Sequence, residues 1–178
     1  MYQIRILADD GLIKKEYRTE LVDIFRDSGL NFEYVECDTH AKGGVIWFAT
    51  GLIIAAVGMT AQGFFSAVGE DLYNKLKELI KDSLKNPPEN TPGIGVAYIS
   101  FINDGIEFYF EFSEFMMDNY DEASSRILAD NDRIASEFRI ISKKELENIH
   151  GEFTSVTLRF DENSRRWIVA HYNLLVSI

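Results

Sequence analysis

At 178 residues, with 46% hydrophobic and 13% aromatic residues, the chain is long enough for one packed domain and short for two. Its formal net charge of −11 repels phosphate backbones and anionic lipid, so nucleic-acid binding and docking on an anionic membrane are not expected. The single cysteine, Cys37, excludes an intrachain disulfide and a cysteine-based zinc cluster within one chain, and it favours a cytoplasmic location.

The N-terminal part of the chain predicts a β-α-β unit. Apolar and polar residues alternate over residues 2–8, which indicates a strand. Apolar residues recur at helical spacing over residues 13–24, and Gly29 stands where that helix is expected to end. Aromatic and β-branched residues in the range 31–37 then predict a second strand.

An uncharged apolar segment follows, over residues 43–69. It is longer than the roughly 20 residues that cross a bilayer as a helix, so one interpretation is a membrane-active segment. If the segment is helical, four small residues share one face and would let another backbone approach closely, as in membrane helix pairs. These four are Gly44, Gly51, Ala55 and Gly58.

Three observations favour a different interpretation of residues 43–69. Six glycines and several hydroxyl and amide side chains dilute the hydrophobicity of this segment. A single membrane span would place the strands before and after it on opposite sides of the bilayer, where they could not share a sheet. A helical hairpin broken at Gly58 would have arms too short for a hydrocarbon core of about 30 Å. We therefore expect a buried glycine-rich apolar helix, with a subunit-contact helix and a membrane segment as alternatives.

The middle of the chain predicts a helix and a hairpin. Apolar residues at a spacing of about 3.6 over residues 72–84 indicate an amphipathic helix, which Pro87 and Pro88 end. Residues 94–102 and 106–112 flank an Asn-Asp-Gly turn signal, so they predict an antiparallel hairpin. Within the second strand, phenylalanines alternate with glutamates and a tyrosine, which predicts one buried face and one polar face.

The C-terminal part predicts a long helix, a short helix and a second hairpin. Ser113 is a candidate cap for a helix with an apolar stripe to residue 138. A capping box begins a short helix at residue 142, which Gly151 ends. Residues 153–160 and 165–175 form the last hairpin.

The elements together predict an α+β fold in a single domain over residues 1–178, with residues 86–92 as a candidate sub-division. The expected order is β-α-β-α-α-β-β-α-α-β-β. We expect a mixed or antiparallel sheet of about six strands with helices on one face, including the buried glycine-rich apolar helix.

The end of the second predicted strand carries a candidate nucleophile. Cys37 and His40 lie close together in the sequence there, and a thiol beside an imidazole could act as a nucleophile and its base. Strand ends carry active sites in α/β proteins. No family signature surrounds the pair, so a chance co-occurrence is the favoured interpretation.

The other histidines, His150 and His171, show no spacing typical of metal ligands. His150 precedes Gly151 and suits the C-terminal end of a helix. His171 alternates in register with Trp167 and is expected to be half-buried on the same sheet face. The glycine pair at residues 93–95 precedes a strand, which is the wrong context for a phosphate loop. Neither a metal nor a cofactor is therefore expected.

Two further groups of side chains are candidate binding sites. Glu107, Glu111 and Glu114 with Tyr109 could line a carboxylate cleft, but a solvated sheet face is the favoured interpretation. The other group is a small basic and aromatic cluster at the tip of the last hairpin, which consists of Arg165, Arg166 and Trp167. It could meet a partner carboxylate, but Asp161 and Glu162 across the turn balance its charge, so a local ion-pair arrangement is the favoured interpretation.

The leading functional hypothesis is a non-enzymatic, intracellular protein-interaction or assembly module, which binds a protein partner or forms a homo-oligomer. The first alternative is a membrane-active or membrane-anchored component that uses residues 43–69. The second is a small hydrolase or transferase that depends on Cys37 and His40. Residues 69–73 resemble stretches of small bacterial proteins, which implies a bacterial source and no residue roles.

Overall fold

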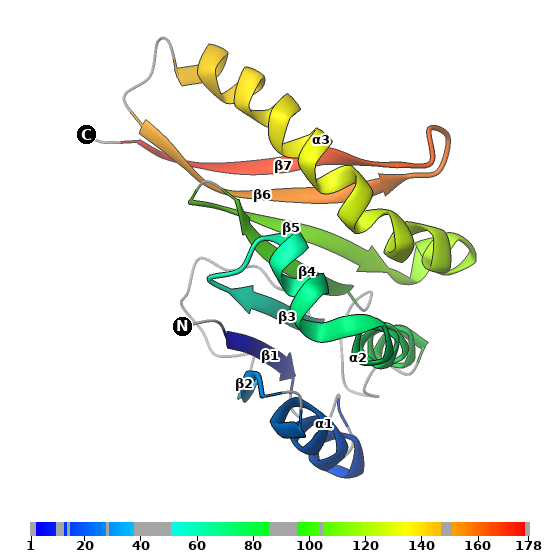
Figure 1. Cartoon of the computed structure of the whole chain (residues 1–178). Helices are drawn as coiled ribbons and strands as arrows, with labels where there is room; N and C mark the ends of the chain where they lie inside the picture. Colours follow the sequence, from blue (N-terminus) through cyan, green and yellow to red (C-terminus); the bar gives the residue numbers. More distant parts are fainter. Residues whose placement is uncertain are drawn as a thin grey trace.

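The computed structural model describes residues 3–9, 13, 15–27, 29–37, 51–85, 96–103, 105–146 and 151–176. They form one seven-stranded mixed sheet with three α-helices packed against it, as Figure 1 shows. The expected single α+β domain with a mixed sheet is confirmed. The strands on either side of residues 86–92 pair directly with one another in that sheet, while residues 86–92 themselves lie outside the described residues.

The strands are β1 (Gln3–Asp9), β2 (Asn31–Cys37), β3 (Gly51–Val57), β4 (Val96–Asn103), β5 (Ile106–Ser113), β6 (Gly151–Asp161) and β7 (Arg166–Val176). The helices are α1 (Lys15–Asp27), α2 (Ala61–Lys85), the 3-10 helix η1 (Glu114–Asn119) and α3 (Tyr120–Leu146). The order across the sheet is β2-β1-β3-β4-β5-β6-β7. Three neighbouring pairs are parallel, β1 with β2, β3 with β4, and β5 with β6. Each of these pairs is joined through a helix, as a parallel connection requires.

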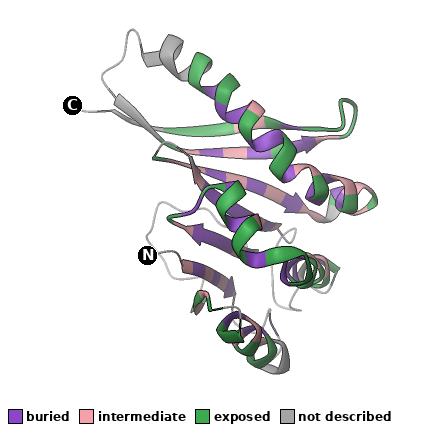
Figure 2. Cartoon of the chain, in the orientation of Figure 1, coloured by how far each residue is buried: buried purple, intermediate pink, exposed green. Residues whose placement is uncertain are grey.

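One face of the sheet forms the core. The register aligns a buried row across the five central strands, consisting of Ile6, Ile54, Ile99, Phe110 and Leu158. The three α-helices lie on this face, α1 beside β2, α2 over β3 and β4, and α3 over β6 and β7. In Figure 2 the strands alternate along their length between buried and less buried residues, because successive side chains of a strand point to opposite faces.

The expected buried helix over residues 43–69 is wrong for residues 51–60, whereas the last part of the segment, from Ala61, is helical in α2. Gly51–Val57 is strand β3, in the interior of the sheet between β1 and β4. Gly58 turns the chain with φ 75, a conformation that glycine adopts at no steric cost. Helix α2 begins only at Ala61. Residues 43–50, including Gly44, lie outside the described residues.

The physical reason for this error is the burial of β3. Leu52, Ile54 and Ala56 point into the core, and Ala55 on the other face is only 9% exposed. A strand that is apolar on both faces has no alternation in its sequence, so periodicity cannot distinguish it from a buried helix. The sheet therefore has seven strands and not about six.

The predicted hairpins are confirmed, and the predicted short helix is not a separate element. β4 pairs antiparallel with β5, and β6 with β7. The short helix expected from residue 142 is instead the C-terminal part of α3, which continues to Leu146. Ser113 precedes η1 but makes no capping hydrogen bond through its side chain.

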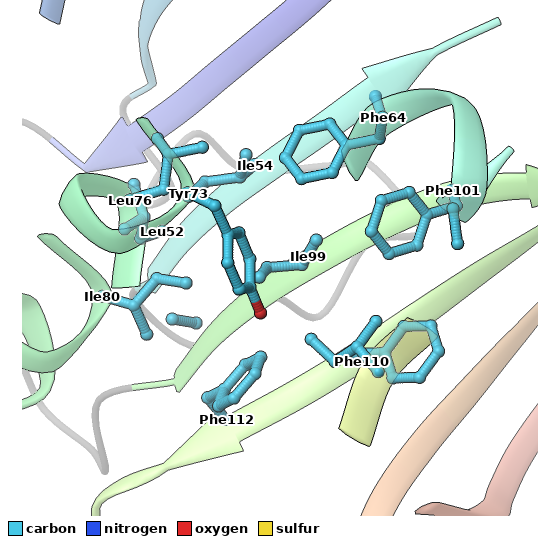
Figure 3. Close-up of a cluster of buried hydrophobic side chains, with 14 of the residues drawn as sticks. Leu52, Ile54, Phe64, Tyr73, Leu76, Ile80, Ile99, Phe101, Phe110 and Phe112 are labelled. Carbon is cyan, nitrogen blue, oxygen red and sulfur yellow. The ribbon is translucent and has the colours of Figure 1, made fainter. Parts of the chain in front are cut away.

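Aromatic side chains hold α2 and α3 to the sheet and to each other. Figure 3 shows Tyr73 of α2 among core residues from β3, β4 and β5. Its hydroxyl donates a hydrogen bond of 2.7 Å to the Ser124 carbonyl of α3. The Tyr120 hydroxyl of α3 donates one of 2.6 Å to the Lys77 carbonyl of α2. Burial raises the pKa of both tyrosines, so both hydroxyls keep the protons that they donate.

Candidate functional site

The second face of the sheet is covered by none of the described helices, and we call it the open face. Its central row consists of Leu7, Ile53, Tyr98, Glu111 and Arg159, one from each of five neighbouring strands. The row is apolar on β1 and β3 and becomes polar from β4 to β6. The polar part is a candidate site because it gathers aromatic, acidic and basic side chains on adjacent strands.

Glu107 of β5 is held in place by two hydroxyl groups. Ser100 Oγ donates a hydrogen bond of 2.9 Å to Glu107 Oε1, and the Tyr109 hydroxyl donates one of 2.7 Å to Oε2. Burial, followed by the bond to Glu107, raises the pKa of Tyr109. Ser100 is only 1% exposed although it lies on the open face. The Glu107 carboxylate is therefore held in place, because both of its oxygens accept hydrogen bonds.

Glu111, on the same face of β5, is held by a tyrosine and an arginine. The Tyr98 hydroxyl donates a hydrogen bond of 3.3 Å to Glu111 Oε2. Arg159 of β6 donates to Glu111 Oε1 from Nε at 3.0 Å and forms an ion pair through Nη2 at 2.8 Å. Burial, and then the Glu111 carboxylate, raises the pKa of Tyr98. Charge-assisted bonds of this kind fix both partners.

Glu107 and Glu111 lie on the sheet face opposite the phenylalanines, as expected, and both are half-buried and hydrogen-bonded. The side chain of Glu114 lies outside what the structure describes. Tyr98 and Tyr109 also contact each other edge-to-face, with ring centroids 6.1 Å apart. Donors and acceptors are matched throughout this cluster, which indicates a rigid surface for binding and not a group prepared for proton transfer.

A hollow of about 590 Å³ adjoins this cluster where β4 begins and β5 and β6 end. We call it the acidic hollow. Glu111 and Arg159 belong to both features. Its walls come from β5, β6, η1 and the turn between β6 and β7, the turn that extends at the right of Figure 1. The residues that line it include Glu111, Ser113, Phe115, Arg159, Asp161 and Glu162.

The charge of the acidic hollow is negative. Arg159 already pairs with Glu111, which leaves Asp161 and Glu162 without a described cation as partner. Hydrogen bonds from Ser164, and further ones from Asn163, lower the pKa of Asp161, so its carboxylate stays ionised at neutral pH. Phe115 adds an aromatic side chain that is 71% exposed. A large exposed aromatic beside uncompensated carboxylates suits a cationic side chain.

The predicted cluster at the hairpin tip is divided by the fold. Trp167 is fully buried, and its Nε1 donates a hydrogen bond of 2.8 Å to the Ala123 carbonyl. Arg165 pairs with Glu122 of α3, and Arg166 is exposed. The tryptophan therefore anchors β7 to α3 and has no surface to offer a partner. A buried indole and an exposed indole look the same in sequence.

The other predicted site residues do not converge. Cys37 ends β2, but its side chain is outside the described part, as is the whole of His40. Gly51 and Ala55 lie in β3, and Gly58 lies in the turn after it. They do not share the helical face that the sequence predicted, because this segment is a strand. Ala55 lies between Arg5 and Ser100 on neighbouring strands.

His171 was expected on the face of Trp167, and this expectation is wrong. A register shift in the β6–β7 ladder pairs Leu158 with Val169 but Thr157 with His171, which leaves Ala170 as an extra residue. Such a β-bulge reverses the alternation of the strand beyond it. His171 therefore lies on the open face and is exposed, while His150 lies outside the described residues.

The described residues carry neither a metal cluster nor a membrane helix. Within the ranges given above, no three His, Cys, Asp or Glu side chains are grouped to hold a metal ion. None of the helices in those ranges is both long and apolar enough to span a membrane. Comparison with protein-family models, with curated proteins and with solved structures finds no match for this chain.

Proposed function

We propose that this chain is a protein-interaction module that binds a basic segment of a partner protein in the acidic hollow. The observation that carries the proposal is the combination of Asp161 and Glu162 with the exposed ring of Phe115 in one hollow. The module works in the cytoplasm of a bacterial cell and has no catalytic role. The single cysteine is consistent with a reducing compartment.

The size and position of the hollow support a peptide ligand. Its volume of about 590 Å³ is within the roughly 300–1,000 Å³ of binding sites, which is room for several side chains. It is continuous with the half-buried cluster of Tyr98 and Glu111 on the open face. An extended segment can therefore place one basic side chain in the hollow and rest its neighbours on that cluster.

Charge supports the choice of a basic partner. Three carboxylates and one guanidinium line the hollow, on a chain whose net charge is −11. The electrostatic field of the whole chain and the local charge of the hollow therefore both attract a basic ligand. This raises the rate of encounter as well as the affinity. Phe115 would contact the alkyl stem or the guanidinium of an arginine, as exposed aromatic rings do at protein interfaces.

Binding of a short fluorescent peptide rich in arginine and lysine tests this proposal by anisotropy. We expect Phe115→Ala and Glu162→Arg each to weaken binding about ten-fold, which corresponds to about 1.4 kcal/mol. Glu70→Arg is the matched control for Glu162→Arg, because Glu70 is exposed on α2 and the change in net charge is the same. Leu128→Ala, at 40% exposure on α3, is the control for Phe115→Ala.

The outcome depends on the difference between site and control variants. The loss of peptide affinity in Phe115→Ala and Glu162→Arg should exceed the loss in the control variants. This loss should diminish as salt is raised from low ionic strength, since added ions screen the charges. Equal weakening by Glu70→Arg would show that the peptide responds only to net charge. That result, or unchanged binding by Phe115→Ala and Glu162→Arg, would reject the acidic hollow as the site.

A further inference from the structure

Arg159 of β6 lies within reach of two carboxylates on the open face and pairs with one of them. Glu111 of β5 is its direct neighbour across the ladder, and Asp161 follows two residues later on the same face of β6. Such cross-strand neighbours lie about 5 Å apart at Cβ, and residues two apart along a strand about 6–7 Å. The guanidinium contacts Glu111 Oε1 from Nε at 3.0 Å and from Nη2 at 2.8 Å, whereas no ion pair joins Arg159 to Asp161, both of which the structure describes.

Burial explains why the guanidinium pairs with Glu111. The Glu111 side chain is 13% exposed, and its other oxygen accepts a hydrogen bond of 3.3 Å from the Tyr98 hydroxyl. A charge pair that is largely buried is screened less than an exposed one, and charge-assisted hydrogen bonds are the stronger ones. Asp161, at the end of β6, accepts a hydrogen bond of 3.0 Å from the backbone N–H of Ser164. The one guanidinium that lines the acidic hollow is therefore neutralised by Glu111 and leaves Asp161 to a ligand.

We infer that Glu111 is a positioning residue of the acidic hollow, which holds Arg159 so that Asp161 stays free for the basic side chain of the partner. The inference rests on the function proposed above and adds how the site keeps its negative charge. Once Glu111 is removed, Asp161 and Glu162 are the carboxylates that line the hollow. Arg159 then turns to them, and the hollow is occupied by its own guanidinium in place of the partner's.

Arg166 of β7 provides the contrast to Arg159. It lies opposite Asp161 in the β6–β7 ladder and is exposed, but it is not among the residues that line the acidic hollow. No ion pair joins it to Asp161 or Glu111, and the structure describes all three residues. Arg166 therefore acts on Asp161 only through the general field, in a way that does not depend on Glu111. This makes Arg166→Gln the matched control for Arg159→Gln.

A double-mutant cycle tests this inference with the fluorescent peptide rich in arginine and lysine. We expect Glu111→Gln, which keeps the shape of the side chain, to raise the dissociation constant of the peptide about ten-fold. Adding Arg159→Gln to the Glu111→Gln chain should restore most of that affinity, because no guanidinium is left to occupy the hollow. Arg159→Gln in the wild-type chain should tighten binding by less than about three-fold, since Glu111 already neutralises Arg159 there.

The decisive quantity is the difference between the effects of Arg159→Gln in the two chains. A change in net charge alone predicts the same tightening with and without Glu111→Gln, as expected for the control Arg166→Gln. Equal effects of Arg159→Gln in the two chains would overturn the inference while the proposed function stands, provided that wild type binds the peptide. Failure of the wild-type chain to bind the peptide would reject the proposed function and this inference with it.

The titration of Asp161, followed by NMR of its carboxyl carbon, tests the movement of Arg159 without any peptide. Hydrogen bonds from Ser164, and further ones from Asn163, already lower the pKa of Asp161, and a guanidinium brought beside it lowers the pKa further. We therefore expect Glu111→Gln to lower the pKa of Asp161 and Arg159→Gln to reverse this change in the same chain. A pKa of Asp161 that Arg159→Gln leaves unmoved in the Glu111→Gln chain would overturn the inference.

Discussion

Trp167→Ala is expected to lower the free energy of unfolding by about 3–5 kcal/mol, the usual cost of truncating a large buried aromatic residue. Trp167 is fully buried, and its ring contacts Phe110, Phe112 and Phe160 at centroid distances of 5.0, 5.3 and 5.7 Å. Alanine would leave a cavity among these rings and would remove the hydrogen bond from Nε1 to the Ala123 carbonyl. Equilibrium unfolding in urea, followed by circular dichroism, measures the change.

Trp167→Phe is the matched variant, because it keeps a ring in the core but removes the indole N–H. We expect it to lose clearly less stability than Trp167→Ala, with a contribution of about 0.5–1.5 kcal/mol from the lost hydrogen bond to the Ala123 carbonyl. A loss below about 1 kcal/mol for Trp167→Ala is typical of a surface position. That result would contradict the full burial of Trp167.

Asp130→Ala has the second largest expected effect, a loss of about 3 kcal/mol. The Asp130 side chain is 5% exposed, with Arg126 Nε at 3.6 Å and Arg133 Nη2 at 3.5 Å. It also accepts a hydrogen bond of 3.0 Å from the backbone N–H of Trp167. Removing the carboxylate leaves the buried Trp167 N–H without its acceptor and takes the paired anion from Arg126, whereas Arg133 keeps Glu137 and the Trp167 carbonyl as acceptors. The unpaired N–H and the lost ion pairs dominate the loss. Urea unfolding again measures the change.

Two further variants separate the charge of Asp130 from its position on α3. Asp130→Asn retains an acceptor for the Trp167 N–H but loses the charge, so it should fall between wild type and Asp130→Ala. Asp132→Ala removes an exposed carboxylate from the same helix and should cost less than about 1 kcal/mol. If Asp130→Ala costs no more than Asp132→Ala, the buried cluster does not hold α3 to β7 as described.

Local periodicity predicted the elements that have one buried face. Phe108, Phe110 and Phe112 are all at most 2% exposed, as the alternation in residues 106–112 indicated. The register of this hairpin follows from its Asn-Asp-Gly turn, and it places Ser100 opposite Tyr109. Most of the polar cluster around Glu107 could therefore be derived from one hairpin. The burial of this cluster could not be derived from the hairpin, because burial depends on neighbouring strands that are distant in the sequence.

Periodicity failed where both faces of an element are buried or where the ladder is irregular. β3 is an apolar run without alternation, so its length and its glycines favoured a helix. The β-bulge at Ala170 moves His171 to the other face, and no local residue pattern signals it. Burial of Trp167 depends on Asp130 and Ala123 of α3, whose packing against β7 the sequence does not reveal.

The acidic hollow is the part of the candidate site that sequence patterns could not predict. Phe115 belongs to η1, Arg159 to β6 and Glu162 to the turn after β6. These elements are separated in sequence by the whole of α3, and they meet only because β6 returns parallel to β5. The net charge of −11 was the single sequence signal, and it argued against nucleic acid and anionic lipid without indicating where a partner binds.

Hydrogen exchange of the chain with and without the bound arginine- and lysine-rich peptide tests the proposed binding site most directly. The acidic hollow predicts slower exchange in two separate stretches, around Ser113–Phe115 and around Asp161–Asn163, with β2 and α1 unchanged. Slower exchange confined to other elements, such as the groove between α1 and α2 lined by Leu21, Ile24 and Leu79, would contradict the proposal.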